Sequence, residues 1–255
     1  MVGHAVLETP DGRCLLYDVG TTGGPDVVRR VVAPYLWSRG IRRIDEVFVL
    51  HADADHFNGL VELLRRFPVG RVTLTPSFSE KPTAQVAETL LALNEHGIET
   101  RTVTVGQAFK AGDADFEVLH PPAVGPLGIE NERSMVLVVR HAGHTVLLTG
   151  DIEKAGAAMV LGKPGQAVDV LQAPHHGSRA AYNPQWNAWA HAGFVVSSRG
   201  DLYTNTIREA DLGPNAVLWE TEVQGAITLR SHRTGLTAEA FRTGERRIAA
   251  RSGEK

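Results

Sequence analysis

Short apolar runs alternate with helical patterns of apolar and polar residues along the whole chain. The runs predict strands over residues 13–17, 46–50, 71–75, 168–172, 194–197, 217–219, 226–230 and 236–241. Residues 134–140 and 145–149 predict a hairpin and are apolar without alternation, as in strands covered on both faces. Helices are expected at residues 34–39, 59–66, 83–96, 153–161 and 184–190. Covered sheets with outer helices indicate a layered α/β sandwich.

The helix expected over residues 83–96 has the clearest pattern of all. Its apolar stripe consists of Val86, Leu90 and Leu93, extended by Ala87 and Leu91. A stripe of this width predicts a helix packed along one side on a sheet.

Composition and charge narrow the class of protein. The chain has 255 residues, of which 43% are apolar, enough for a sizeable core. We expect one domain over residues 1–241 and a basic, flexible tail over residues 242–255. Its single cysteine, Cys14, excludes an internal disulfide, and no run approaches the roughly 18 apolar residues of a membrane span. The net charge of −3 gives no global field that would hold a polyanion.

The strongest chemical signal is the segment His51-Ala52-Asp53-Ala54-Asp55-His56. It follows the apolar run of residues 47–50 directly, so four potential ligands lie where a buried strand ends. In an extended chain, positions 51, 53 and 55 project to one side. Carboxylates this close disfavour joint ionisation unless a cation compensates them, which points to a metal site.

Two further segments end predicted strands with polar residues. One is Gly150-Asp151, and the other is the pair His175-His176 within Pro174–Ser178. Either alone is compatible with an ordinary polar turn. Ligand sites of open α/β sheets lie at the carboxyl ends of strands, where all three segments fall, so we expect them to share one pocket.

These motifs together resemble the metallo-β-lactamase-fold superfamily, and more closely the hydrolase-like domain of ComEC-type DNA-uptake (competence) proteins. The resemblance covers about residues 2–230. It rests on Leu50-His51-x-Asp-x-Asp-His56-x-Asn-Gly-Leu60 and Ala173-Pro-His-His-Gly-Ser178. It is supported by Pro10-Asp-Gly-Arg-x-Leu-Leu-x-Asp-x-Gly20, Pro34-Tyr-Leu-x-x-Arg-Gly-Ile-x-x-Ile44, Asn131-x-x-Ser-x-Val136 and Leu147-Leu-Thr-Gly-Asp151.

The resemblance implies a four-layered αβ/βα sandwich with one or two divalent ions between the sheets. The implied metal ligands are His51, Asp53, Asp55, His56, Asp151 and His175. The implied catalytic residues are Asp55, His175 and His176, and the implied substrate-binding residues are Asn131, Ser134, Ser178 and Arg179.

The chain departs from the superfamily pattern in four places. Asp53 stands where a second histidine is commonest, and residues 130–132 (Glu-Asn-Glu) stand near the place of another histidine ligand. Residues 199–206 lack the histidines usual in the competence subgroup, and the first strand looks shortened at residues 1–4. A ligand set rich in oxygen favours manganese slightly over zinc.

The function that we expect is metal-dependent hydrolysis of phosphodiesters, with DNA as substrate and a metal-activated water as nucleophile. The alternatives are a catalytically silent binding module and a hydrolase of a small ester, thioester or lactam. A candidate DNA patch comprises Arg29, Arg30, Arg39, Arg42 and Arg43, with a solvated helix face as the alternative.

Expected partners are DNA and a membrane channel domain, upstream or in trans. No nucleotide cofactor is expected, because the chain lacks a Gly-x-x-x-x-Gly-Lys loop. The oligomeric state is left open. The chain as it stands is expected in the cytoplasm, and at a membrane if it is a fragment of a longer competence protein.

Overall fold

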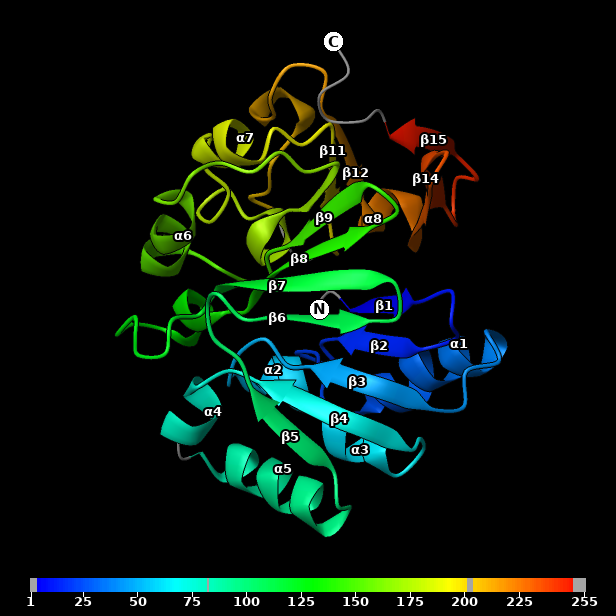
Figure 1. The fold of residues 1–255 in the computed structure, drawn as a ribbon, viewed down its shortest axis with the longest axis vertical. Helices are drawn as coiled ribbons and strands as arrows, with labels where there is room; N and C mark the ends of the chain where they lie inside the picture. Colours follow the sequence, from blue (N-terminus) through cyan, green and yellow to red (C-terminus); the bar gives the residue numbers. More distant parts are fainter. Residues whose placement is uncertain (1–3, 82, 201–203, 250–255) are drawn as a thin grey trace.

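The computed structural model describes residues 4–81, 83–200 and 204–249, with two large sheets at its centre (Figure 1). The five-stranded sheet has the order β1 (Ala5–Glu8), β2 (Cys14–Tyr17), β3 (Ile44–Phe48), β4 (Val69–Leu74) and β5 (Glu99–Thr102). The seven-stranded sheet has the order β12 (Val217–Glu220), β11 (Phe194–Ser197), β10 (Val170–Gln172), β9 (His144–Leu148), β8 (Val136–His141), β7 (Ala114–His120) and β6 (Ala108–Ala111). The strands from β2 to β5 are parallel, as are those from β9 to β12.

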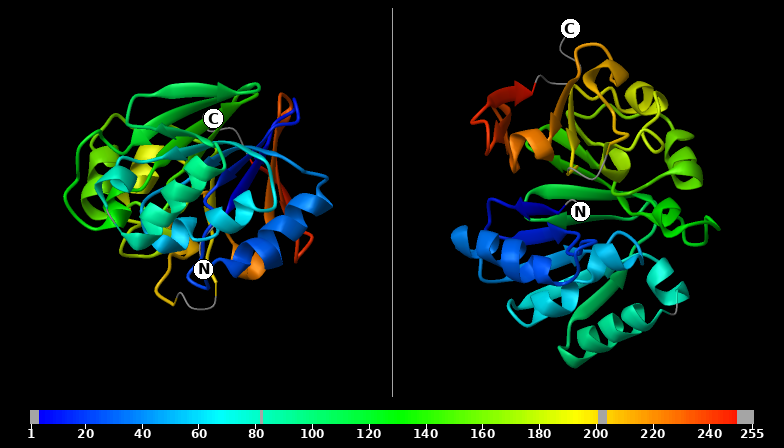
Figure 2. Two further views of the ribbon diagram at one scale, coloured as in Figure 1. Left: turned by 90° about the horizontal axis from the view of Figure 1, so that it is seen from below. Right: turned by 180° about the vertical axis from the view of Figure 1, so that it is seen from behind.

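Helices cover the outer side of each large sheet, so the molecule has four layers (Figure 2). Beside the five-stranded sheet lie a π-helical segment η1 (Val28–Val32), α1 (Ala33–Ser38), α2 (Ala54–Phe57), α3 (Leu60–Leu64), α4 (Ser77–Glu80) and α5 (Ala84–Glu95). Beside the seven-stranded sheet lie α6 (Lys154–Leu161) and α7 (Gln185–Ala190), and α8 (Thr221–Gln224) follows β12. Short 3₁₀ turns are η2 (Glu130–Arg133), η3 (Pro174–Gly177) and η4 (Glu209–Asp211). The predicted four-layered sandwich is confirmed.

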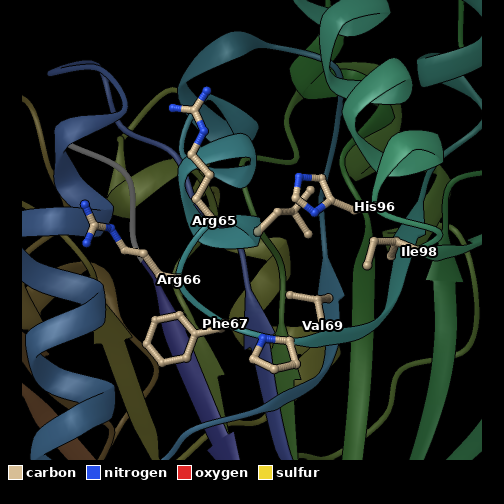
Figure 3. A pocket seen from close by; sticks show the side chains of 8 residues that line it. Arg65, Arg66, Phe67, Val69, His96 and Ile98 are labelled. Carbon is tan, nitrogen blue, oxygen red and sulfur yellow. The ribbon is translucent and has the colours of Figure 1, made fainter.

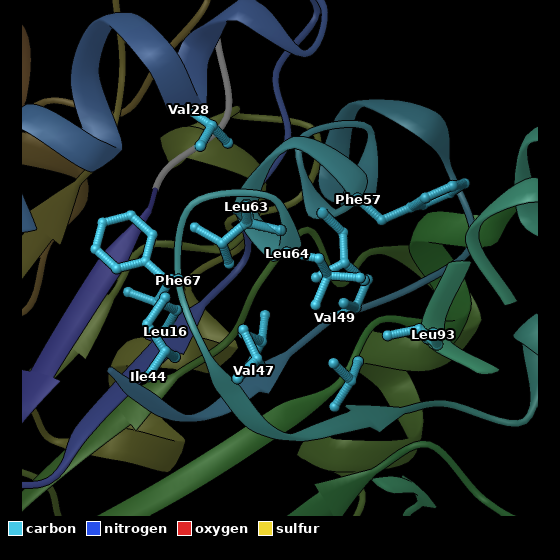
Figure 4. Packing of buried hydrophobic residues seen from close by; sticks show 14 of the residues in the cluster. Leu16, Val28, Ile44, Val47, Val49, Phe57, Leu63, Leu64, Phe67 and Leu93 are labelled. Atoms are coloured by element: carbon cyan, nitrogen blue, oxygen red, sulfur yellow. The ribbon is translucent and has the colours of Figure 1, made fainter. Parts of the chain in front are cut away.

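Separate apolar clusters join these layers. Leu16 and Val47 of the five-stranded sheet pack on Leu63 and Leu93 of its helices (Figure 4). Between the sheets, buried side chains from both meet in a second cluster that includes Tyr17, Phe48, Phe116 and Leu137. A third cluster packs β8–β11 on α6 and α7. A fully buried Leu or Phe contributes about 1.5–3 kcal/mol by leaving water, so these interfaces hold the sheets in register for the loops at their edge.

Helix α5 shows how local sequence sets an element. The Thr83 side chain accepts a hydrogen bond from the Val86 N–H at 3.2 Å, which caps the first turn. Val86 and Leu93 are buried as expected, but Leu90 and Leu91 are exposed, so that part of the expected stripe is wrong. The buried face turns through Thr89 instead, because positions three and four apart share one side of a helix.

Two close backbone contacts fix the segment that follows β3. A Cβ atom on Gly20 would lie 2.5 Å from the Asp55 carbonyl oxygen, and one on Gly59 would lie 2.0 Å from the Val19 carbonyl oxygen. Glycine is therefore required at both positions. The loop after β2 is held against α2, which places residues 18 and 56 side by side.

The C-terminal part differs from expectation. A third, antiparallel sheet contains β13 (Ile227–His232), β14 (Gly235–Ala240) and β15 (Arg246–Ala249), so residues 246–249 form a strand instead of a flexible tail. Backbone pairing with β14 orders this segment, which its charge content does not reveal. Residues 1–3 and 250–255 lie outside the described parts, so the expected shortening at residues 1–4 and the end of the tail stay predictions, as does the single-domain boundary. No helix in the described parts has the length and apolar character to cross a membrane.

Candidate functional site

Polar side chains from both large sheets meet at the carboxyl ends of their strands. Asp18 follows β2, His56 lies on α2 after β3, Asp151 follows β9, and His176 follows β10. Each segment arrives from a buried parallel strand, and the clusters between the layers bring these ends together. The three segments that were expected to come together therefore meet at one edge of the sandwich, where these four side chains contact one another.

We call these four side chains the Asp151 cluster. One carboxylate oxygen, Asp151 Oδ2, lies 3.3 Å from His56 Nε2 and 3.4 Å from His176 Nε2. On its other side, His56 Nδ1 lies 2.5 Å from Asp18 Oδ2, and His176 Nδ1 donates to the Ser198 carbonyl oxygen at 2.9 Å. At most a tenth of each of these four side chains is exposed. The cluster is a chain of alternating acids and imidazoles inside the protein.

Burial and charge oppose each other within the Asp151 cluster. Burial alone lowers the pKa of His56, but the carboxylates of Asp18 and Asp151 outweigh it and hold that pKa well above the ordinary value. Burial alone raises the pKa of Asp151, but the imidazoles of His56 and His176 hold it well below the ordinary value. Each charge in the cluster thus depends on its neighbours for compensation.

The backbone around Asp151 and His176 is tightly constrained. Gly150 has a φ of +54°, and a Cβ there would lie 2.6 Å from Ser134 Oγ. His175 and His176 both have positive φ, +47° and +57°, which costs of order 1–3 kcal/mol at each non-glycine position. The Gly150 carbonyl accepts a hydrogen bond from the His175 N–H at 2.9 Å, which ties the two segments together. The surrounding packing therefore stabilises a strained backbone that holds the His175 and His176 imidazoles at the same edge of the sheet.

A second group of side chains, the Asp53 cluster, consists of His51, Asp53 and Lys81. Lys81 Nζ donates to Asp53 Oδ1 at 2.6 Å, and His51 Nε2 lies 3.6 Å from Asp53 Oδ2. The His51 imidazole and the Lys81 ammonium together hold the pKa of the Asp53 carboxyl below its usual range. The His51 side chain is fully buried, and neither of its ring nitrogens has a hydrogen-bond partner. The ring centroids of His51 and His56 are 3.9 Å apart, so the two clusters adjoin.

Turn η2 brings further acids to the same edge. Glu130 Oε2 accepts from the Ala52 N–H at 3.3 Å, and Asn131 Nδ2 donates to Glu153 Oε1 at 3.4 Å. The other oxygen of Glu153 lies 3.4 Å from His175 Nδ1. Glu130, near the place of the missing histidine, therefore brings a carboxylate to this edge, and Glu153 brings another.

A tie between the two halves of the molecule crosses the site at the end of α4. Glu80 accepts from Arg133 Nη1 of η2 at 2.7 Å, while the next residue, Lys81, contacts Asp53. Arg133 also donates to the Pro126 carbonyl oxygen at 3.0 Å.

The other predicted site residues have these places. Asp55 lies half-buried on α2, and in the described part of the chain its carboxylate makes no hydrogen bond or ion pair. Ser134 is fully buried and accepts from the Asp151 N–H at 3.1 Å, so it supports Asp151 and does not line a cleft. Ser178 Oγ accepts from the Ala180 N–H, and Arg179 pairs with Asp211 at 2.6 Å. Their roles with substrate stay predictions.

Several residues of the site have no counterpart among the sequence predictions. Asp18 was part of a matched motif but had no role, and its φ of +65° appears only in the fold. Glu153, Lys81 and Ser198 gave no signal, because each is recruited from a separate loop. In residues 4–81, 83–200 and 204–249, no three His, Cys, Asp or Glu side chains form a group ready to hold a metal ion. The imidazoles and carboxylates contact one another instead.

Cations elsewhere on the described surface are largely compensated. In the candidate patch, Arg29 and Arg30 both pair with Asp26. Arg39 pairs with Glu8, and Arg43 pairs with Asp45. A surface hollow between α3 and α5, at the opposite end of β4, has Arg65 and Arg66 on its rim, and both pair with Glu62 (Figure 3). Neither region therefore presents a concentrated positive charge.

Comparison with known proteins supports the family suggested by these motifs. The chain is 33% identical to ComE operon protein 3 of Bacillus subtilis over 153 residues, or 60% of this chain and 19% of that protein. Recombination protein 2 of Haemophilus influenzae is 27% identical over 94% of this chain and 29% of its own length. Competence protein ComA of Neisseria gonorrhoeae is 28% identical over 94% of this chain and 32% of its own length. The chain thus spans between about a fifth and a third of the length of these relatives.

The family model named "Metallo-beta-lactamase superfamily" matches residues 2–187, which include both clusters described above. The layers, the position of the polar residues and this match agree with one another. The chain belongs to the metallo-β-lactamase superfamily and is related to competence proteins.

Proposed function

We propose that the chain is a metal-dependent hydrolase that cleaves phosphodiesters, with DNA as its substrate. The observation that carries the proposal is the position of Asp151 Oδ2 between the Nε2 atoms of His56 and His176. Two imidazoles and a carboxylate that face one another at a strand edge are a typical ligand set for a divalent cation.

The donor types suit such a cation, and the side chains, which contact one another as they stand, would separate to admit it. Asp18 orients His56 by accepting from its Nδ1, so Nε2 faces Asp151; the Ser198 carbonyl does the same for His176. The buried His51 nitrogens, which have no hydrogen-bond partner, are a further reason to expect a ligand here. His56, Asp151 and His176 would hold the ion. A divalent cation supplies the charge that lowers the pKa of a water molecule and stabilises negative charge on phosphate.

The protein's own groups would carry the remaining chemistry. His175 is partly exposed, and its Nδ1 lies 3.4 Å from Glu153 Oε2, so the carboxylate can stabilise a protonated ring that donates to a leaving oxygen. Arg133 pairs with Glu80, and its guanidinium can bind a phosphate in place of that carboxylate. DNA as substrate is supported by the relationship to a protein named for competence.

The test is hydrolysis of labelled single- and double-stranded DNA with added manganese, and with zinc or magnesium for comparison. Asp151→Asn and His176→Gln are expected to lose at least about a hundredfold in rate, because they remove groups that face the reacting centre. His232→Gln is the matched control, since His232 is exposed and only its backbone carbonyl is used. Circular dichroism checks that each variant folds.

Three results would contradict the proposal. Full activity in Asp151→Asn would remove the Asp151 cluster from the reaction. Hydrolysis of an ester, thioester or lactam without any cleavage of DNA would favour the small-molecule alternative. Stable binding of DNA without metal and without turnover would favour a silent binding module.

A further inference from the structure

The two clusters at the site differ in what already balances their charge. The two carboxylates of the Asp151 cluster pair with imidazoles, and Asp18 also accepts from the Leu50 N–H at 3.3 Å. The Asp53 carboxylate instead has a lysine ammonium on one oxygen at 2.6 Å. His51 faces the other oxygen of Asp53 at 3.6 Å. Lys81 supplies this ammonium and pairs directly with a member of the Asp53 cluster.

A divalent ion at the Asp53 cluster would have to sit beside this ammonium. The Lys81 side chain is 29% exposed and comes from the end of α4, where Glu80 holds the backbone by its pair with Arg133. Like charges a few ångströms apart repel, and the adjoining Asp151 cluster lies within ring contact of His51. The Lys81 ammonium therefore disfavours a divalent cation at Asp53.

We propose that Lys81 is a built-in cation that takes the place of a metal ion at Asp53, so that the chain holds one divalent ion, at the Asp151 cluster. The inference rests on the metal-dependent function proposed above. It assigns Lys81 as a positioning residue that sets the number of ions. It also gives Asp53 a role that requires no metal, as the counter-ion of a lysine.

The test is the number of manganese ions bound per chain, measured by equilibrium dialysis with metal analysis and by the electron paramagnetic resonance signal of free Mn²⁺. The wild-type chain is expected to bind one ion. Lys81→Met removes the ammonium and is expected to bind two, while Lys81→Arg keeps the charge and is expected to bind one. Lys110→Met is the matched control, because Lys110 forms a similar pair with Asp115 at 2.7 Å on a strand remote from the site.

The outcomes separate this inference from the proposed function. Two ions in the wild-type chain, or one ion in a folded Lys81→Met chain, would overturn the role of Lys81 and leave the metal-dependent function standing. No bound ion in the wild-type chain would overturn both. A second ion in Lys110→Met would show that loss of any lysine has this effect, and would also overturn the inference.

Discussion

The Asp151 cluster and the Asp53 cluster adjoin at one edge of the sandwich but differ in how deeply their carboxylates are buried. The side chains of Asp18 and His56 are almost fully buried, whereas Asp53 is 39% and Lys81 29% exposed. Buried charges depend on their partners because water cannot replace them, while exposed pairs exchange readily with water. The same kinds of residues therefore support the fold in one cluster and only tune the site in the other.

The largest effect is expected from breaking the buried pair of Asp18 and His56. Asp18→Ala leaves His56 without its 2.5 Å partner and should destabilise the fold by about 3–5 kcal/mol. Asp18→Asn, which keeps the size and one oxygen, should cost clearly less. Urea unfolding followed by circular dichroism measures both; equal, small losses would mean that the cluster is not a structural unit.

The buried imidazole of His120, which lies outside both clusters, should make the stability of the fold depend on pH in the acid range. Burial lowers the pKa of His120 to about 4, although its ring lies 2.8 Å from the Ser134 carbonyl oxygen. The native state keeps His120 neutral, whereas the unfolded chain protonates it near pH 6.5. Stability should therefore fall by about 3 kcal/mol between pH 6.5 and 4 and level off below. Denaturant unfolding of wild type and His120→Gln across this range measures the difference, which vanishes if His120 is not the cause.

A smaller loss of stability is expected from removing the Ser134 hydroxyl, which accepts from the Asp151 N–H. Ser134→Ala removes the acceptor of the Asp151 N–H and leaves a buried donor unsatisfied, at a cost of about 1–3 kcal/mol. Ser134→Thr keeps the hydroxyl as a control. If Ser134 instead contacts substrate, the alanine variant would keep its stability in urea unfolding and lose affinity for DNA.

The smallest change in stability is expected from breaking the partly exposed pair of Lys81 and Asp53. Lys81→Met should change the free energy of unfolding by less than about 1 kcal/mol, since half-exposed ion pairs contribute little. Thermal unfolding without added metal checks this value. A loss as large as that of Asp18→Ala would erase the difference between the two clusters.

Sequence patterns predicted the sandwich because strands and helices depend on local periodicity. The strands expected at 13–17 and 194–197 are present as β2 and β11 within a residue of their predicted bounds. Strand β5, Glu99–Thr102, was missed because it is a polar edge strand with three of four residues exposed. Its backbone pairing with β4 forms only in the assembled sheet.

The site was predictable where ligands follow a strand and not where they arrive from elsewhere. His56, Asp151 and His176 could be grouped because each lies in a short segment that follows an apolar run. An extended segment was expected to aim residues 51, 53 and 55 to one side, but α2 begins at Ala54 and turns Asp55 away from that line. Lys81 lies on a loop after α4, and its proximity to Asp53 depends on tertiary packing.

The neighbouring contacts of Glu80 and Lys81 have a mechanical consequence. Glu80 joins the half with the five-stranded sheet to Arg133 of the other half, whereas the pair of Lys81 with Asp53 lies within one half, so a hinge-like separation of the halves at this edge must release the Glu80–Arg133 pair. The Glu80 carboxylate is 42% exposed, and salt screens such charges within about 8 Å at physiological ionic strength. Rising salt should weaken this pair and make the edge open more often.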